Sequence, residues 1–200
     1  MGCYVAKRSN QDDIELFHEK GVHIPSRTIY FQQDDTPDEI GSEIGPKAAE
    51  RLIKNLHVLT FISNDPIKIV MNTQGGSVYD GLAIYDAINN CPAHITITAL
   101  GCVMSMGVIV LQAADHRVAY PFTRLMAHDG EDSASGHTRD FEKAGDESRV
   151  IRLNMYAILA KHTGKPASYW SRKLSRDYYM SAQQALSEGL LDEVITNTEL

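Results

Sequence analysis

The sequence predicts an α/β fold in which helices cover a largely parallel sheet. Two successive segments, residues 67–90 and 95–114, each have the pattern of an apolar strand, a turn and an apolar helix. Strands that alternate with helices in this way are joined by crossovers and lie parallel. Of the 200 residues, 43% are hydrophobic, which is enough to bury one substantial core. We therefore expect one soluble, globular unit.

The chain before this repeat predicts an arm, a strand and a helix. Residues 1–27 are polar and weakly periodic, which indicates a loosely ordered arm or a segment that contacts a partner. A short strand is expected at 28–31 and a turn at 34–37. The pattern over 44–61 is helical, with one apolar side formed by Ala48, Leu52, Leu56 and Leu59. We divide the chain into this arm and a folded domain over 28–200.

The first unit of the repeat has recognisable ends. Its strand is expected at 67–71, followed by a turn at 72–76 that contains two glycines. A helix then begins at Ser77 and ends near Asn90, because Pro92 cannot continue it.

The second half of the chain predicts shorter strands and two further helices. Strands are expected at 116–120 and 124–127, and the Gly-, Ser- and acid-rich residues 129–137 indicate a flexible or edge segment. A helix capped by Ser181 ends at Gly189, before a closing strand at 190–195.

The longest helical pattern covers residues 138–163. Its apolar positions are Phe141, Ala144, Val150, Ile151, Met155, Ile158 and Leu159. At 1.5 Å per residue such a helix reaches roughly 39 Å, more than a compact domain requires. We expect it to project and to cover its apolar side by oligomerisation. The alternative is a kink near Gly145 that folds the first part of the helix back onto the domain.

Composition excludes several classes of function. The net charge of −7 predicts no basic stripe for nucleic acid. Cys3, Cys91 and Cys102 have no metal-ligand spacing, and three free thiols suit a reducing, cytoplasmic location. The sequence has no apolar signal-peptide region and no run long enough to span a membrane. It has no zinc-protease motif and no dinucleotide-binding glycine pattern, so neither a metal nor a cofactor is expected.

Ser105 is the first candidate catalytic residue. It lies between the strand expected at 95–100 and the helix expected at 106–114, where a sharp turn would hold its hydroxyl near the first N–H groups of the helix. The alternative is an ordinary helix N-cap. His128 follows a strand, and the alternative to a catalytic role is an ordinary strand-end histidine. Asp177 lies in a polar segment, and its alternative roles are to cap a turn or to pair with Arg176.

Several motifs together resemble the proteolytic subunits of the Clp protease family over about residues 28–196. In chain order, the motifs are Gly75-Gly76-Ser77-Val78, Ser105-Met106-Gly107, Leu125-Met126-Ala127-His128, His162-Thr163-Gly164, Arg176-Asp177-Tyr178-Tyr179-Met180-Ser181-Ala182 and Glu188-Gly189-Leu190-Leu191-Asp192. Each is weak alone, but their joint order is specific. The resemblance implies the Clp/crotonase-type α/β fold, with a protruding handle of a strand and the long helix at about 129–163.

The resemblance also implies a serine endopeptidase that cleaves unfolded polypeptides. Ser105 would be the nucleophile, His128 the general base and Asp177 the carboxylate that orients the imidazole. The backbone N–H groups of Gly76 and Met106 would form the oxyanion hole. An extended substrate would be flanked by Ser77, Val78, Asp129, Gly130 and Glu131.

The assembly implied by the resemblance is a homo-oligomer of two stacked heptameric rings, a tetradecamer with enclosed sites. An ATP-dependent AAA+ unfoldase is a further implied partner, but residues 1–27 lack the family's usual start, so we leave this partner open.

The sequence departs from the family pattern in three places. Gln74 replaces a common proline, Val103 and Met104 replace two small residues, and an acidic segment starting at Asp129 replaces a Gln-Pro strand. The acids are expected to disfavour acidic peptides. Two other functions remain open: a crotonase-class acyl-CoA hydratase or isomerase, and a ring subunit without catalysis.

Overall fold

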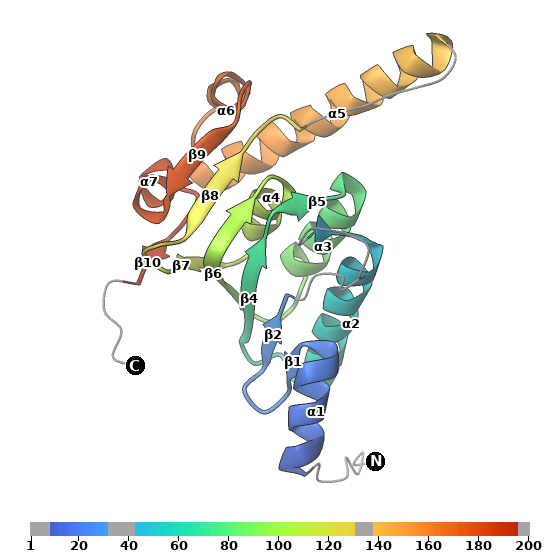
Figure 1. The fold of residues 1–200 in the computed structure, drawn as a ribbon, viewed down its shortest axis with the longest axis vertical. Helices are drawn as coiled ribbons and strands as arrows, with labels where there is room; N and C mark the ends of the chain where they lie inside the picture. Colours follow the sequence, from blue (N-terminus) through green and yellow to red (C-terminus); the bar gives the residue numbers. More distant parts are fainter. Residues whose placement is uncertain (1–8, 32–42, 131–137, 196–200) are drawn as a thin grey trace.

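The computed structural model describes residues 9–31, 43–130 and 138–195. Figure 1 shows a central sheet with helices packed against it and one long helix that projects from the body. The strands are β1 (Val22–His23), β2 (Thr28–Tyr30), β3 (Glu43–Ile44), β4 (Ile67–Thr73), β5 (Gly75–Gly76), β6 (Ile95–Met104), β7 (His116–Ala119), β8 (Arg124–Ala127), β9 (Tyr178–Ser181) and β10 (Glu193–Val194). The helices are α1 (Asn10–Lys20), α2 (Pro46–Ile62), α3 (Val78–Asn89), α4 (Met106–Leu111), α5 (Thr138–Thr163), α6 (Ala167–Lys173) and α7 (Ala182–Glu188).

The main sheet is largely parallel, as predicted. Its strand order is β1-β2-β4-β6-β7-β10, and β8 joins it by pairing with both β6 and β9. The pairs β2–β4, β4–β6, β6–β7, β6–β8 and β7–β10 are parallel, whereas β1–β2 and β8–β9 are antiparallel. The short strands β3 and β5 form a separate parallel pair.

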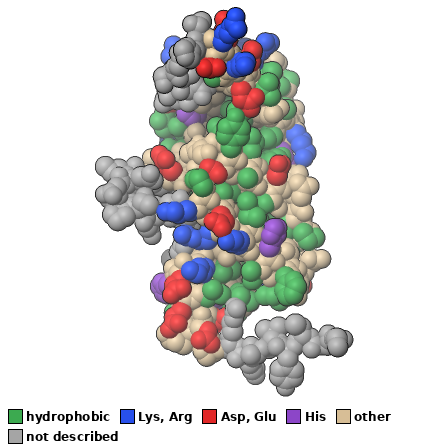
Figure 2. Space-filling view, turned by 90° about the vertical axis from the view of Figure 1, so that its right-hand side faces the viewer, with side chains coloured by type: hydrophobic (Ala, Val, Ile, Leu, Met, Phe, Trp, Pro, Cys, Tyr) green, Lys and Arg blue, Asp and Glu red, His purple; other side chains and the backbone are tan. Residues whose placement is uncertain are grey.

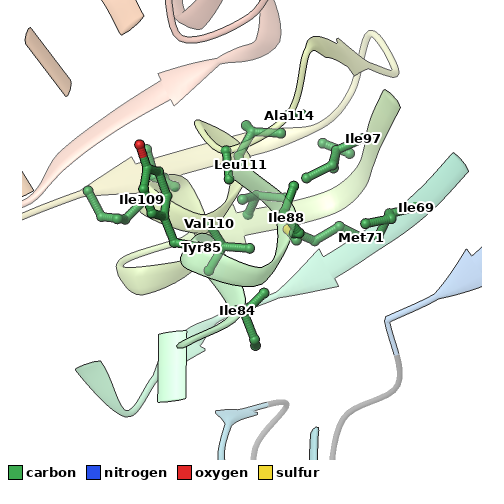
Figure 3. Close-up of a cluster of buried hydrophobic side chains, with 14 of the residues drawn as sticks. Ile69, Met71, Ile84, Tyr85, Ile88, Ile97, Ile109, Val110, Leu111 and Ala114 are labelled. Carbon is green, nitrogen blue, oxygen red and sulfur yellow. The ribbon is translucent and has the colours of Figure 1, made fainter. Parts of the chain in front are cut away.

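The hydrophobic core lies between this sheet and the helices α2, α3 and α4. Figure 3 shows isoleucines of the sheet meeting side chains of α3 and α4. Ile69 and Ile97 on the sheet and Ile84 on α3 are fully buried. All six residues of α4 are buried as well. The start of α4 is therefore fixed by packing on every side.

Strand β6 changes partner along its length. Its first part pairs with β7 from Thr96 to Ala99, and its last part pairs with β8 from Cys102 to Met104. Between them Gly101 has φ = 64°, and the backbone N–H of Cys102 donates to the Asn72 side chain at 3.1 Å. This change carries the end of β6 away from β7 and next to β8.

The elements agree with the sequence prediction in type more than in length. The turn expected at 72–76 is mostly strand, because β4 continues through Thr73 and Gly75–Gly76 forms β5. The helix expected at 106–114 ends at Leu111. Helix α6 and strand β9 were not predicted, since both are short and neither has a clear apolar period. The turn expected at 34–37 lies outside the described residues.

The first 27 residues are more ordered than predicted, as far as the structure describes them. Helix α1 has a capping box at Ser9 and ends at Gly21, whose φ of 69° is left-handed. After α1 in the chain, β1 pairs with β2, and Val22 of β1 is buried. The amide of Asn55 donates to the Lys20 carbonyl at 2.8 Å. Helix α1 buries no residue of its own, so its sequence has no apolar stripe that could have revealed it.

The long helix α5 has the bounds that the sequence predicts, and it continues unbroken through Gly145. Figure 1 shows its first half pointing away from the sheet, so the alternative of a folded-back segment is wrong. Phe141, Val150 and Leu153 are each more than half exposed on it. Figure 2 shows acidic and basic side chains together at its outer end, at the top of the view. Residues 131–137, where the handle strand was expected, lie outside the described residues.

Candidate active site

Ser105 occupies a strained turn between β6 and α4. Its backbone has φ = 50° and ψ = −123°. Within the described ranges, Arg27 is the other non-glycine residue with positive φ. Strain of this kind persists only where the surroundings impose it. Here the Ser105 N–H donates to the Met126 carbonyl of β8 at 2.7 Å.

The Ser105 hydroxyl does not cap α4. The helix has no side-chain cap bond at this position. Instead, Ser105 Oγ lies 2.7 Å from Nε2 of His128. The N-cap alternative for Ser105 is therefore wrong, and the strand-end alternative for His128 does not account for its contact with a serine hydroxyl.

His128 and Asp177 meet because β8 and β9 are antiparallel. Ala127 pairs with Tyr178, so the residues just beyond this pair, His128 and Asp177, face each other. His128 Nδ1 lies 3.5 Å from Asp177 Oδ1. This distance is within ion-pair range but longer than an ordinary N–H···O hydrogen bond. The His128 side chain is 16% exposed, whereas that of Asp177 is 51% exposed.

The paired glycines of β5 lie directly against the Ser105 turn. A Cβ atom on Gly75 would be 2.7 Å from Ser105 Cβ and 3.0 Å from the Met106 nitrogen. Gly75 and Gly76 have φ values of 102° and 140°, which other residues rarely adopt. The Met106 N–H is the first of α4 and has no carbonyl partner within its own helix. The Met106 N–H and the serine hydroxyl are thus brought together beside β5.

A cleft of about 420 Å³ opens in front of Ser105 and His128. It is lined by Glu43, Gly76, Ser77, Val78, Ser105, His128, Asp129, Gly130, Ser148, Ile151 and Met155. Four of the predicted substrate-binding residues therefore line it, and the fifth, Glu131, lies outside the described residues. A narrower apolar pocket adjoins the cleft, bounded by Met106, Ile109, Met155, Leu159 and Leu174 among others.

The sequence did not predict the far wall of the cleft. Glu43 comes from the two-residue strand β3, and Ser148, Ile151 and Met155 come from α5. The apolar residues of α5 were recognised only as part of a helical pattern, because nothing in that pattern shows which of them face a cavity.

The loop after His128 is tied to the neighbouring helices. The Tyr156 hydroxyl of α5 donates to Asp129 Oδ1 at 2.6 Å, and the Asp129 N–H donates to the Leu174 carbonyl at 3.0 Å. Burial, together with this bond to Asp129, raises the pKa of Tyr156, so the phenol stays protonated as a donor. At least one of the acids after His128 thus has a partner within the protein.

A family model for the Clp protease matches residues 38–198 of this chain. The chain belongs to the Clp protease family. It is 36% identical over 164 residues to an ATP-dependent Clp protease proteolytic subunit of Deinococcus radiodurans. The aligned region covers 80% of this chain and 79% of that protein. It is 31% identical over 162 residues to proteolytic subunit 2 of Thermobifida fusca, with 80% of each chain covered.

A solved structure supports the same assignment. A mutant of ClpP1 from Listeria monocytogenes superposes with a TM-score of 0.77 at 30% identity, covering 88% of this chain and 95% of that one. The predicted Clp protease family, the Clp-type α/β fold and the assignment as a serine peptidase are therefore confirmed.

In the ranges that the structure describes, no three His, Cys, Asp or Glu side chains are grouped so that they could hold a metal ion. No helix there is both long enough and apolar enough to cross a bilayer.

Proposed function

We propose that this Clp protease is an endopeptidase that cleaves polypeptides with a Ser105–His128–Asp177 triad. The main support is the 2.7 Å contact between Ser105 Oγ and His128 Nε2, which is made at a strained turn. A hydroxyl is a weak nucleophile unless an adjacent base accepts its proton. The imidazole is that base when its Nδ1–H donates to Asp177, which leaves Nε2 as an acceptor for Ser105.

The reaction follows from this arrangement. Ser105 Oγ attacks the peptide carbonyl while its proton passes to His128, and Asp177 stabilises the imidazolium that forms. The carbonyl oxygen becomes an oxyanion, for which the N–H groups of Met106 and Gly76 are the proposed donors. His128 returns the proton to the leaving amine, and water then hydrolyses the ester on Ser105 by the same route.

The cleft suits an extended peptide. Gly76, Ser77 and Val78 line one side of it, and we propose that a substrate adds as a further strand beside Gly76 at the end of β5. The narrow pocket beside Ser105 is lined mainly by apolar side chains and suits an apolar residue at the cleaved bond. Main-chain recognition of this kind accepts many sequences, consistent with unfolded polypeptides as substrates.

We place this activity in an oligomer of two stacked heptameric rings. Support comes from the projecting helix α5 with its exposed apolar residues, which require cover. A cytoplasmic location also remains a proposal, and an AAA+ unfoldase partner stays open because residues 1–27 lack the family's usual start.

The proposed activity is tested by peptide and thioester substrates offered to the same protein preparation. We expect hydrolysis of a short fluorogenic peptide with an apolar residue before the cleaved bond, and no hydration or isomerisation of an enoyl-CoA thioester. Turnover of the thioester without peptide hydrolysis would show a crotonase-class enzyme instead. Assembled rings without either activity would show a subunit that lacks catalysis.

Peptides that carry a basic residue near the cleaved bond are expected to react faster than acidic ones. Glu43 is exposed at the cleft, and among the described residues its carboxylate has no ion-pair partner. For otherwise identical lysine and glutamate peptides at low salt, we expect a kcat/KM ratio of at least about threefold. Glu43→Gln should reduce this ratio, whereas Glu15→Gln on α1, at the opposite end of the molecule from α5 (Figure 1), should not. An unchanged ratio in both variants would contradict a role for Glu43.

A further inference from the structure

Glu188, at the end of α7, is a buried carboxylate that the proposed reaction does not use. It is only 9% exposed. The hydroxyl of Tyr169 donates to its Oε2 at 2.7 Å, and the hydroxyl of Tyr178 donates to its Oε1 at 2.9 Å. Lys165 forms an ion pair with it, and Lys173 Nζ lies 3.8 Å from Oε1. One carboxylate therefore connects α7, α6, β9 and the loop after α5.

The hydrogen bonds to Glu188 keep it ionised. Burial by itself raises the pKa of a carboxyl group, but the bonds from Lys165, Tyr169 and Tyr178 more than offset this and hold the pKa of Glu188 below its ordinary value. Hydrogen bonds to a charged acceptor are stronger than those between neutral groups. Tyr178 is therefore held firmly by its side chain as well as by its pairing with Ala127.

Tyr178 is covalently joined to Asp177, the proposed third member of the triad. Asp177 has little support from its own side chain, which is half exposed. In the part of the chain that the structure describes, its carboxylate makes one ion-pair contact, the 3.5 Å approach to His128. Its position relative to His128 is thus set by the backbone at the start of β9.

We propose that Glu188 and Tyr178 are positioning residues that hold the Asp177 carboxylate against His128. This inference rests on the proposed triad. A small displacement at the start of β9 would lengthen a contact that is already longer than an ordinary hydrogen bond. Misplacement of a catalytic group by about 1 Å can cost about 10²-fold in rate. Loss of the anchor should therefore lower kcat, because Asp177 acts on the imidazolium that forms in the transition state, and leave KM nearly unchanged.

Two matched tyrosine variants separate positioning from simple stabilisation. Tyr178→Phe and Tyr169→Phe each remove one hydroxyl that donates to Glu188, but only Tyr178 adjoins Asp177. Both should unfold at slightly lower denaturant concentration than the native protein. Assayed at the same oligomeric state, Tyr178→Phe should lower kcat for peptide hydrolysis about tenfold, and Tyr169→Phe should stay within about twofold. Equal losses of kcat would overturn the inference, because they would show a structural role alone.

A double-mutant cycle with Asp177→Ala tests whether Tyr178 acts through Asp177. If it does, Tyr178→Phe should cause no further loss of kcat once Asp177→Ala is present. A further tenfold loss in that background would overturn the positioning role of Tyr178, but it would not contradict the proposed triad. If Asp177→Ala itself leaves kcat unchanged, the proposed role of Asp177 is wrong, and the inference fails with it.

Discussion

Ser105→Ala is expected to lower kcat for peptide hydrolysis by about 10⁴-fold to 10⁶-fold, the range seen when a triad member is removed. The substitution deletes the hydroxyl that contacts His128 Nε2, so the proposed nucleophile is lost. KM should change little, because the cleft walls are untouched. The measurement is hydrolysis of a fluorogenic peptide by native and variant proteins of the same oligomeric state.

The fold should survive this substitution. Alanine removes a single oxygen, and Ser105 already holds the unfavourable positive φ that alanine would adopt. Ser187→Ala is a matched control, because Ser187 is an exposed serine of α7 whose hydroxyl donates to a nearby backbone carbonyl. Activity of Ser105→Ala within tenfold of the native protein would mean that another group is the nucleophile.

Gly75→Ala is expected to lower kcat by about 10²-fold to 10³-fold, similar to the loss for removal of an oxyanion donor. Its new Cβ would lie 2.7 Å from Ser105 Cβ and 2.8 Å from the Met104 carbonyl oxygen, so either the serine turn or β5 must move. The backbone φ of 102° adds strain for any residue other than glycine. The measurement is kcat for the same peptide.

Gly145→Ala is the matched control for Gly75→Ala. Gly145 lies within α5, and a Cβ atom there would meet nothing within 4 Å. Alanine should raise helix stability by up to about 1 kcal/mol and leave kcat unchanged. If both glycine variants keep native kcat, the close approach of β5 to Ser105 has no part in catalysis.

The sequence predicted the elements that have a strong local pattern. The strand-turn-helix units and the bounds of α5 follow from apolar periodicity, from Pro92, which cannot continue a helix, and from Gly164, which ends α5 in a left-handed conformation. Ser105 was found because it lies where a strand pattern changes to a helix pattern. In all these cases the information lies within a few neighbouring residues.

What the sequence did not predict depends on contacts between distant residues. The approach of Asp177 to His128 was expected only from the family resemblance; in the structure it follows from the β8–β9 register, and β9 has no local pattern strong enough to reveal it. Glu43 reaches the cleft through a two-residue strand, and Glu188 gains its role from tyrosines on two other elements. Residues in such positions look like ordinary surface acids until the chain is folded.

Covalent labelling can show whether Ser105 is a nucleophile activated by His128. The protein would be treated with a fluorophosphonate, which reacts with activated serine hydroxyls, and the modified residue identified by peptide mass spectrometry. We predict one adduct, on Ser105, in the native protein and none in His128→Ala. An adduct on a different serine, or peptide hydrolysis that continues while Ser105 is fully modified, would contradict the claim.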